Sequence, residues 1–272
     1  MTGQHLKVMC CRKQAKTIAD TCQAIEFALR ELNDNHSFYR TANGKSYLYF
    51  DAPCAEMVSP PDVTQQLNIG YVRVPSFDGL TNSAAQADQF SVSLQTTIKN
   101  QDNGNLKGWI VDLRGNGGGN MWPMLSGIGP VLGEGPVGYF IDPDDRTSVW
   151  YYREGVAYLN GFKASAVVNP YTLINVNPKV AVLIGLTASS GEAIAIAFIG
   201  RPNTRLFGAH PSCGQTTANM TFTLSDGAIL GISTSVMTDR NMNKFGGPII
   251  PDETGSGGLD GAVAAAIDWL NK

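Results

Sequence analysis

The sequence predicts a layered α/β domain, because segments with the pattern of strands alternate with segments with the pattern of helices. The clearest example is the stretch 180–198. It opens with a continuous apolar run at 180–186, which predicts a strand buried on both faces, and closes with an Ala- and Ile-rich segment at 192–198, which predicts a packed helix. No internal repeat or low-complexity linker divides the 272 residues, so we expect one large domain or two small ones.

The other elements follow from the spacing of apolar residues. Residues 13–32 are predicted to form an amphipathic helix, which ends in the turn-forming run Asn33-Asp34-Asn35-His36-Ser37. Residues 53–61 are predicted to be an irregular connector. Residues 139–152 form a hairpin that turns at Asp142-Pro143-Asp144-Asp145. Further strands are predicted at 47–50, 67–75, 109–113, 205–208, 221–224 and 228–238, and further helices at 84–100, 122–128 and 261–270.

Composition excludes several classes of function. Charged residues make up 16% of the chain and the net charge is -3, so neither nucleic acid nor an anionic membrane surface is an expected partner. No apolar run is long enough to span a bilayer, and the first residues lack the apolar core of a signal peptide. The compartment and the oligomeric state stay open, a homo-oligomer included.

The five cysteines match no zinc or thioredoxin spacing. Free thiols, or one disulfide with unpaired cysteines left over, are expected, and no metal or cofactor is expected. Cys213 lies in a glycine-bearing loop and is a weak candidate nucleophile, because only His210 is nearby to pair with it.

The turn between the strand at 180–186 and the helix at 192–198 contains two adjacent serines, Ser189 and Ser190. A strand that enters a helix through small hydroxyl residues directs backbone N–H groups and one side chain at the same point, which suits a nucleophile and an oxyanion site. The alternative is that the serines only cap the helix. Glu192 is expected to cap this helix or to pair with a charge.

A glycine run follows the strand at 109–113, in the segment DLRGNGGGN. It lacks the spacing of a dinucleotide fingerprint and the Lys of a phosphate loop. Consecutive glycines at a strand end can turn their N–H groups outward, so this loop and the N–H of Ser190 could form a two-donor oxyanion hole. The alternative is a tight turn lined with glycine for packing. Arg114 is expected to anchor an ion pair.

Three segments together resemble the C-terminal processing (tail-specific) serine peptidases: DLRGNGGG, the later TASSGE, and the earlier IGYVRVPSF. The run Asn33–Ser37 resembles the L-x-D-x-H-S element of the branch that includes the tricorn core and the interphotoreceptor retinoid-binding protein modules. The segments at 207–216 and 250–252 resemble the family's F-G-x-x-T-x-G and I-x-P-D segments. The resemblance covers residues 29–270.

This resemblance implies an αββ superhelical catalytic domain of the ClpP/crotonase type at 67–272, preceded by an N-terminal helical segment and connector at 1–66. It implies hydrolysis of an amide or peptide bond through an acyl-enzyme. The nucleophile falls on Ser189, the oxyanion donors on the N–H groups of Gly117, Gly118 and Ser190, and the base on His36. A histidine base just beyond a helix C-terminus suits proton transfer near neutral pH.

The chain departs from the family pattern at the other catalytic positions. Gln215 stands near the place of the catalytic Lys, so a Ser–Lys dyad would need another lysine such as Lys244. The histidine branch carries a Glu ahead of the x-P-D segment, and here Asp239 is the substitute expected to orient His36. Asp34, Asn241 or no orienter remain alternatives, and His210 is the rival base.

About 32 residues separate His36 from Ile69, too few for a PDZ module of roughly 80–100 residues. The expected substrate is therefore a peptide or a small acyl compound. Three alternatives remain: a small-molecule ester or amide hydrolase, a catalytically inactive ligand-binding relative, and a crotonase-like acyl-CoA enzyme that uses the glycine loop without a nucleophile.

Overall fold

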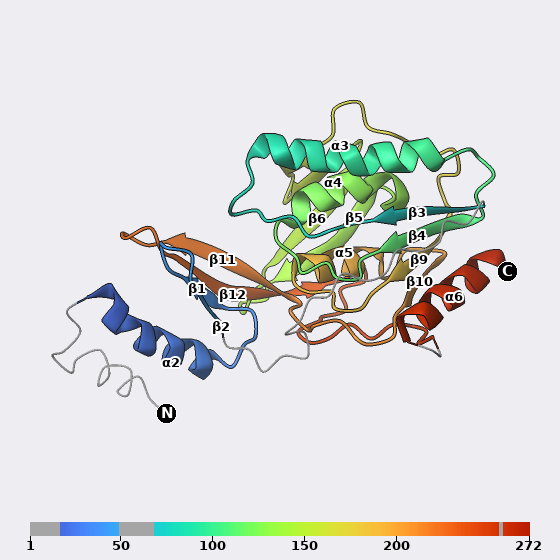
Figure 1. Cartoon of the computed structure of the whole chain (residues 1–272). Helices are drawn as coiled ribbons and strands as arrows, with labels where there is room; N and C mark the ends of the chain where they lie inside the picture. Colours follow the sequence, from blue (N-terminus) through green and yellow to red (C-terminus); the bar gives the residue numbers. More distant parts are fainter. Residues whose placement is uncertain (1–16, 49–67, 256–257) are drawn as a thin grey trace. The chain divides into compact units, whose positions relative to one another are not determined.

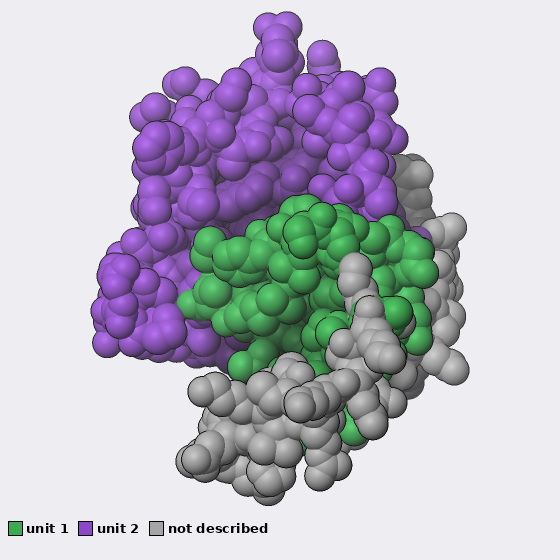
Figure 2. All heavy atoms as spheres, turned by 90° about the vertical axis from the view of Figure 1, so that its left-hand side faces the viewer, with its two compact units in different colours: residues 1–55, 218–234 green, residues 56–217, 235–272 purple. Residues whose placement is uncertain are grey.

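The computed structural model describes residues 17–48, 68–255 and 258–272, whose course is drawn in Figure 1. The chain divides into two compact units, coloured separately in Figure 2. Unit 1 contains Met1–Ala55 and Ala218–Thr234, and unit 2 contains Glu56–Thr217 and Ser235–Lys272. Residues 218–234 are thus grouped with the N-terminal segment, although they lie far from it in sequence. The expected connector at 53–61 lies outside the described residues.

Unit 2 is built on a four-stranded parallel sheet. Its strands, in spatial order, are β10 (Thr204–Phe207), β9 (Lys179–Leu183), β4 (Gly108–Asp112) and β3 (Ile69–Arg73). Parallel neighbours need crossover connections, and helix α3 (Ala84–Gln101) joins β3 to β4 while α5 (Ser190–Phe198) joins β9 to β10.

Both faces of this sheet are covered, which explains the continuous apolar runs of its central strands. On one face, Trp109 and Val111 of β4 enter a large core that also contains residues of α4 (Met121–Leu132) and α5. On the other face, Ile110 packs in a smaller core with Leu270 of α6 (Gly258–Asn271). The predicted strand at 109–113 and the predicted α/β class are confirmed. The strand predicted at 180–186 is also present, but it ends at Leu183.

Helix α4 continues four residues beyond the predicted end, through Pro130. Proline has no N–H, so the carbonyl of Ser126 loses the donor that an α-helix would place four residues later. The side chain of Gln95 on α3 supplies it, with Nε2 donating to the Ser126 oxygen at 2.8 Å. None of the helices in the described ranges has the length and hydropathy to cross a membrane.

Unit 2 also contains an antiparallel run of strands, in the order β12-β5-β6-β7-β8. The predicted hairpin appears as β5 (Gly135–Ile141) and β6 (Thr147–Arg153), turning through Asp142, and the C-terminal half of β12 (Ile229–Thr238) pairs with β5. The next strands, β7 (Val156–Leu159) and β8 (Phe162–Ala166), were not predicted, because four or five half-exposed residues give too short a periodic signal.

Unit 1 contains the 3₁₀ turn η1 (Ile18–Thr21), helix α2 (Cys22–Leu32), and strands β1 (Phe38–Arg40), β2 (Ser46–Leu48) and β11 (Thr217–Thr223). Within it, β1 pairs with β2 and with the N-terminal part of β12, and β11 pairs with β12. A small core gathers Leu29 of α2 and Tyr39 of β1. Gly231 lies opposite Phe38, and a Cβ there would be 2.3 Å from the Phe38 ring, so the register requires a glycine.

Candidate active site

The turn from β9 into α5 places Ser189 immediately before the first residue of the helix. The Ser189 backbone has φ 53° and ψ -120°, in a region that residues with a side chain rarely adopt. Such strain is held by surrounding contacts and is frequent at active sites, including the sharp strand-to-helix turns that present nucleophilic serines. Ser189 is half-buried. The predicted path from a buried strand through small hydroxyl residues into a packed helix is confirmed.

The glycine loop after β4 lies directly against this turn. A Cβ added to Gly118 would be 2.7 Å from the Ser189 Cβ and 2.8 Å from the Ser190 nitrogen. The loops are also joined by hydrogen bonds: Ser190 Oγ donates to the Gly119 carbonyl at 2.6 Å, and the Ala188 N–H donates to the Asn116 carbonyl at 2.9 Å. The predicted meeting of the serine turn and the glycine loop is therefore confirmed.

The amides of the glycine loop differ in what they contact. The Gly117 N–H donates to Ser76 Oγ at 2.7 Å, and the Gly118 N–H donates to Asn116 Oδ1 at 2.9 Å. Among the described residues, the N–H groups of Gly119 and Ser190 donate to no acceptor. Gly119 is exposed, whereas Ser190 is buried and its amide lies at the positive end of the α5 dipole.

Glu192 connects the serine turn to the loop that follows β10. Its carboxylate accepts the Ser189 N–H at 2.9 Å, the Gly214 N–H at 2.8 Å, the Gln215 N–H at 2.7 Å and the Ser212 hydroxyl. The side chain is fully buried. Burial raises the pKa of Glu192, although these four hydrogen bonds act in the opposite direction. Glu192 thus caps α5, as predicted, and it also holds residues 212–215 in place.

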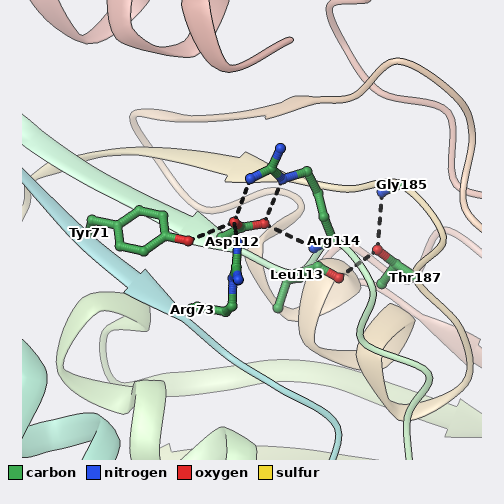
Figure 3. Close-up of polar contacts among 7 residues, drawn as sticks. All are labelled: Tyr71, Arg73, Asp112, Leu113, Arg114, Gly185 and Thr187. Carbon is green, nitrogen blue, oxygen red and sulfur yellow. Dashed lines mark hydrogen bonds and ion pairs between the residues drawn. The ribbon is translucent and has the colours of Figure 1, made fainter. Parts of the chain in front are cut away.

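A buried ion pair lies at the end of β4, before the glycine loop (Figure 3). Arg114 donates to both carboxylate oxygens of Asp112, through Nε at 2.9 Å and Nη2 at 2.8 Å. Tyr71 OH, at 2.8 Å, and Arg73 Nη2, at 3.2 Å, contact the same carboxylate. Burial alone would raise the pKa of Asp112, but hydrogen bonds and charge attraction from Arg114 hold it below its ordinary value. The predicted anchoring role of Arg114 is confirmed.

Thr187 fastens the serine turn to the end of β4, as Figure 3 also shows. Its hydroxyl donates to the Leu113 carbonyl at 2.8 Å and accepts the Gly185 N–H at 3.1 Å. The Asp112 ion pair and the Thr187 hydroxyl therefore fix the chain at the start of the glycine loop and at the start of the serine turn.

Replacing Asp112 with Asn is expected to destabilise the protein by about 3 kcal/mol at neutral pH, because Arg114 is then buried without a counter-ion. The lowered pKa means that the stabilising effect of the Asp112 carboxylate is present above its unfolded pKa of 3.8 and is lost as the pH falls through the folded value. Urea unfolding should therefore show a gap between wild type and D112N that closes at acid pH. Asp145→Asn, which removes the exposed pair with Lys244, is the control and should change nothing measurable.

His36 lies in unit 1, in the loop after α2, where Asn33 ends the helix in the left-handed conformation at φ 50°. Asp34 organises this loop. Its carboxylate accepts the N–H groups of His36 at 2.8 Å and Ser37 at 3.0 Å, and the hydroxyls of Ser37 and Ser233. Burial acts to raise the pKa of Asp34, but these hydrogen bonds hold it below its ordinary value. The predicted place of His36, just beyond a helix C-terminus, is confirmed.

The remaining candidates have other contacts. The Asp239 carboxylate is buried and accepts the N–H groups of Asn241 at 2.8 Å and Asn243 at 3.0 Å, and the Asn243 amide at 2.8 Å. Lys244 pairs with Asp145 at 3.0 Å on the surface. His210 is exposed. Cys213 is disulfide-bonded, so it is not a thiolate nucleophile; the cysteines at 10, 11 and 54 lie outside the described residues.

A layered α/β domain with a serine on a strained turn, next to a glycine loop and at a helix N-terminus, is the arrangement expected of a serine hydrolase of the ClpP/crotonase-like type. Residues 68–254 match the profile of peptidase family S41, and the chain belongs to this family. It is a serine-type peptidase. The expected resemblance to the C-terminal processing peptidases is thereby confirmed.

Similar proteins are found both by sequence and by structure. The nisin-resistance protein of Lactococcus lactis subsp. lactis is 29% identical over 262 residues, which cover 95% of this chain and 76% of that protein. The structure of a lipoprotein from Streptococcus agalactiae superposes with a TM-score of 0.75 at 23% identity, over 98% of this chain and 87% of the other. The photosystem II D1 C-terminal processing protease superposes with a TM-score of 0.50 at 19% identity, over 77% of this chain and 49% of the other. The two superpositions establish the fold.

Proposed function

We propose that this peptidase cleaves its substrate through an acyl-enzyme formed on Ser189, with His36 as the base. The observation that carries the proposal is the contact of the Ser189 turn with the glycine loop and with the open N-terminus of α5. This arrangement offers a hydroxyl and backbone N–H donors at one place, which acyl transfer requires.

In this mechanism His36 accepts the Ser189 hydroxyl proton while the oxygen attacks the carbonyl carbon of the scissile bond. The Ser190 N–H and the glycine loop stabilise the negative oxygen of the tetrahedral intermediate. The N–H groups of Gly117 and Gly118 already donate to side chains, so we assign the second donor to Gly119. Collapse of the intermediate breaks the C–N bond, and the leaving amine takes the proton from His36. Water then hydrolyses the ester.

We assign the positioning of His36 to Asp34 and not to Asp239. Asp34 binds the His36 backbone directly, whereas the hydrogen bonds of Asp239 come from the turn that follows it. The rival of the whole proposal is an inactive ligand-binding relative, which the missing family Lys and Glu would suit.

Labelling with a fluorophosphonate tests the assignment of the base. Wild-type protein should be modified at Ser189 at neutral pH, and His36→Ala should lower the rate on the order of 10³-fold or more, because the hydroxyl then lacks a proton acceptor. His210→Ala is the matched control and should react like wild type. Labelling that survives H36A but not H210A would transfer the role to His210, and absence of labelling in all three would favour the inactive relative.

The name of the Lactococcus lactis relative supports nisin as the first peptide to be tested as a substrate. Mass spectrometry of nisin incubated with the protein should detect a fragment that is absent when Ser189→Ala is used.

A further inference from the structure

Strand β11 of unit 1 has the properties of a strand that accepts a partner. Among the described residues it pairs with β12 alone, so its other edge carries backbone groups without a neighbouring strand. Residues 217–224, TANMTFTL, contain no charge and no proline, the devices that usually protect an edge from pairing. Its exposed side chains include Met220, 56% exposed, and Phe222, 46% exposed, at alternate positions and therefore on one face.

A hydrogen bond joins β11 to the loop that carries His36, the proposed base. Asn219 of β11 donates from Nδ2 to the His36 carbonyl at 2.7 Å. Ser233 of β12, which binds Asp34, also contacts Asn219 Oδ1 at 3.2 Å. A peptide that paired with the edge of β11 would thus lie along a strand that begins beside His36.

We propose that the edge of β11 binds the peptide substrate in an extended conformation, as an added strand, with apolar substrate side chains against Met220 and Phe222. Main-chain hydrogen bonds would give affinity that depends little on sequence, and the apolar pair would favour uncharged segments. The inference rests on the proposed function, because the direct link to His36 is what favours a substrate over a second copy of the chain.

Binding is measured on the Ser189→Ala protein, so that the result does not depend on turnover. The probe is a fluorescein-labelled peptide of seven alternating apolar and hydroxyl residues, the length of β11. The double variant Met220→Ser/Phe222→Ser should raise its Kd about tenfold, as expected when two apolar contacts are lost. Phe162→Ser, which removes a 79% exposed aromatic side chain from β8, is the matched control and should leave Kd unchanged.

A second probe tests strand pairing itself. A peptide of the same sequence in which every backbone nitrogen is methylated cannot donate the ladder hydrogen bonds and should bind at least tenfold more weakly. Equal binding of both peptides, or an unchanged Kd in the double variant, would overturn the proposal. Self-association of the wild type that the double variant abolishes would instead assign the edge to a second copy. If the wild type is not labelled by the fluorophosphonate but both binding results are as expected, the proposed catalytic function is wrong and the proposed peptide site on β11 is still supported.

Discussion

Ser189→Ala is expected to lower kcat on the order of 10⁴–10⁶-fold, because the nucleophile is removed while the rest of the site remains. Peptide binding should stay close to that of wild type. The free energy of unfolding should fall by about 1 kcal/mol, because the Ser189 side chain accepts the Glu192 N–H at the start of α5 and alanine cannot. The measurement is single-turnover cleavage of a peptide, together with fluorophosphonate labelling, which should be absent.

Ser190→Ala is the matched control, one residue away in the same turn. The Ser190 hydroxyl donates to the Gly119 carbonyl, so its removal should cost about 1 kcal/mol of stability and only a modest part of the activity. The backbone N–H assigned to the oxyanion is unaffected by this substitution. If S190A abolished labelling and S189A did not, the nucleophile would be the second serine and the assignment would be wrong.

Replacing Glu192 with Gln has the largest expected effect on stability. The carboxylate accepts two donors at each oxygen in a fully buried site. The amide nitrogen of glutamine cannot accept, so in either orientation backbone N–H groups lose their acceptor, either that of Gly214 or those of Ser189 and Gln215. Each buried donor left without an acceptor costs about 1–3 kcal/mol, so we expect a loss of several kcal/mol in the free energy of unfolding. Because one of the donors is the Ser189 N–H, the labelling rate should also fall about 100-fold.

The control for stability is Gln95→Ala. Gln95 lies on α3, whereas Glu192 lies on α5 and Ser189 directly precedes it. The substitution leaves the Ser126 carbonyl and the Tyr171 N–H without their side-chain partner, so it also disturbs buried hydrogen bonds. The labelling rate of Q95A should be unchanged at temperatures where the protein is folded. If both variants lost labelling in proportion to stability, Glu192 would have only a structural role and no positioning role.

Much of the site was predictable because its signals are local. The buried run before Ser189, the adjacent serines and the glycines after β4 are each continuous in sequence, and strand, turn and helix N-terminus follow from neighbouring residues. Strands β7 and β8 and the end of α4 were missed for the opposite reason. The strands are short and half-exposed, and the donor that Pro130 cannot supply to the Ser126 carbonyl comes from Gln95, on another helix.

The chain's own order of residues was enough to predict an α/β peptidase fold and the two loops that meet at Ser189. It could not reveal which amides remain open, because Ser76 and Asn116 occupy those of Gly117 and Gly118 only once the chain is folded. It also could not show that Glu192 binds residues 212–215, or that β11 is bonded to the His36 loop. Apart from the local bond between Asn116 and Gly118, these features depend on polar groups that are distant in sequence, and only folding brings such groups within hydrogen-bonding distance.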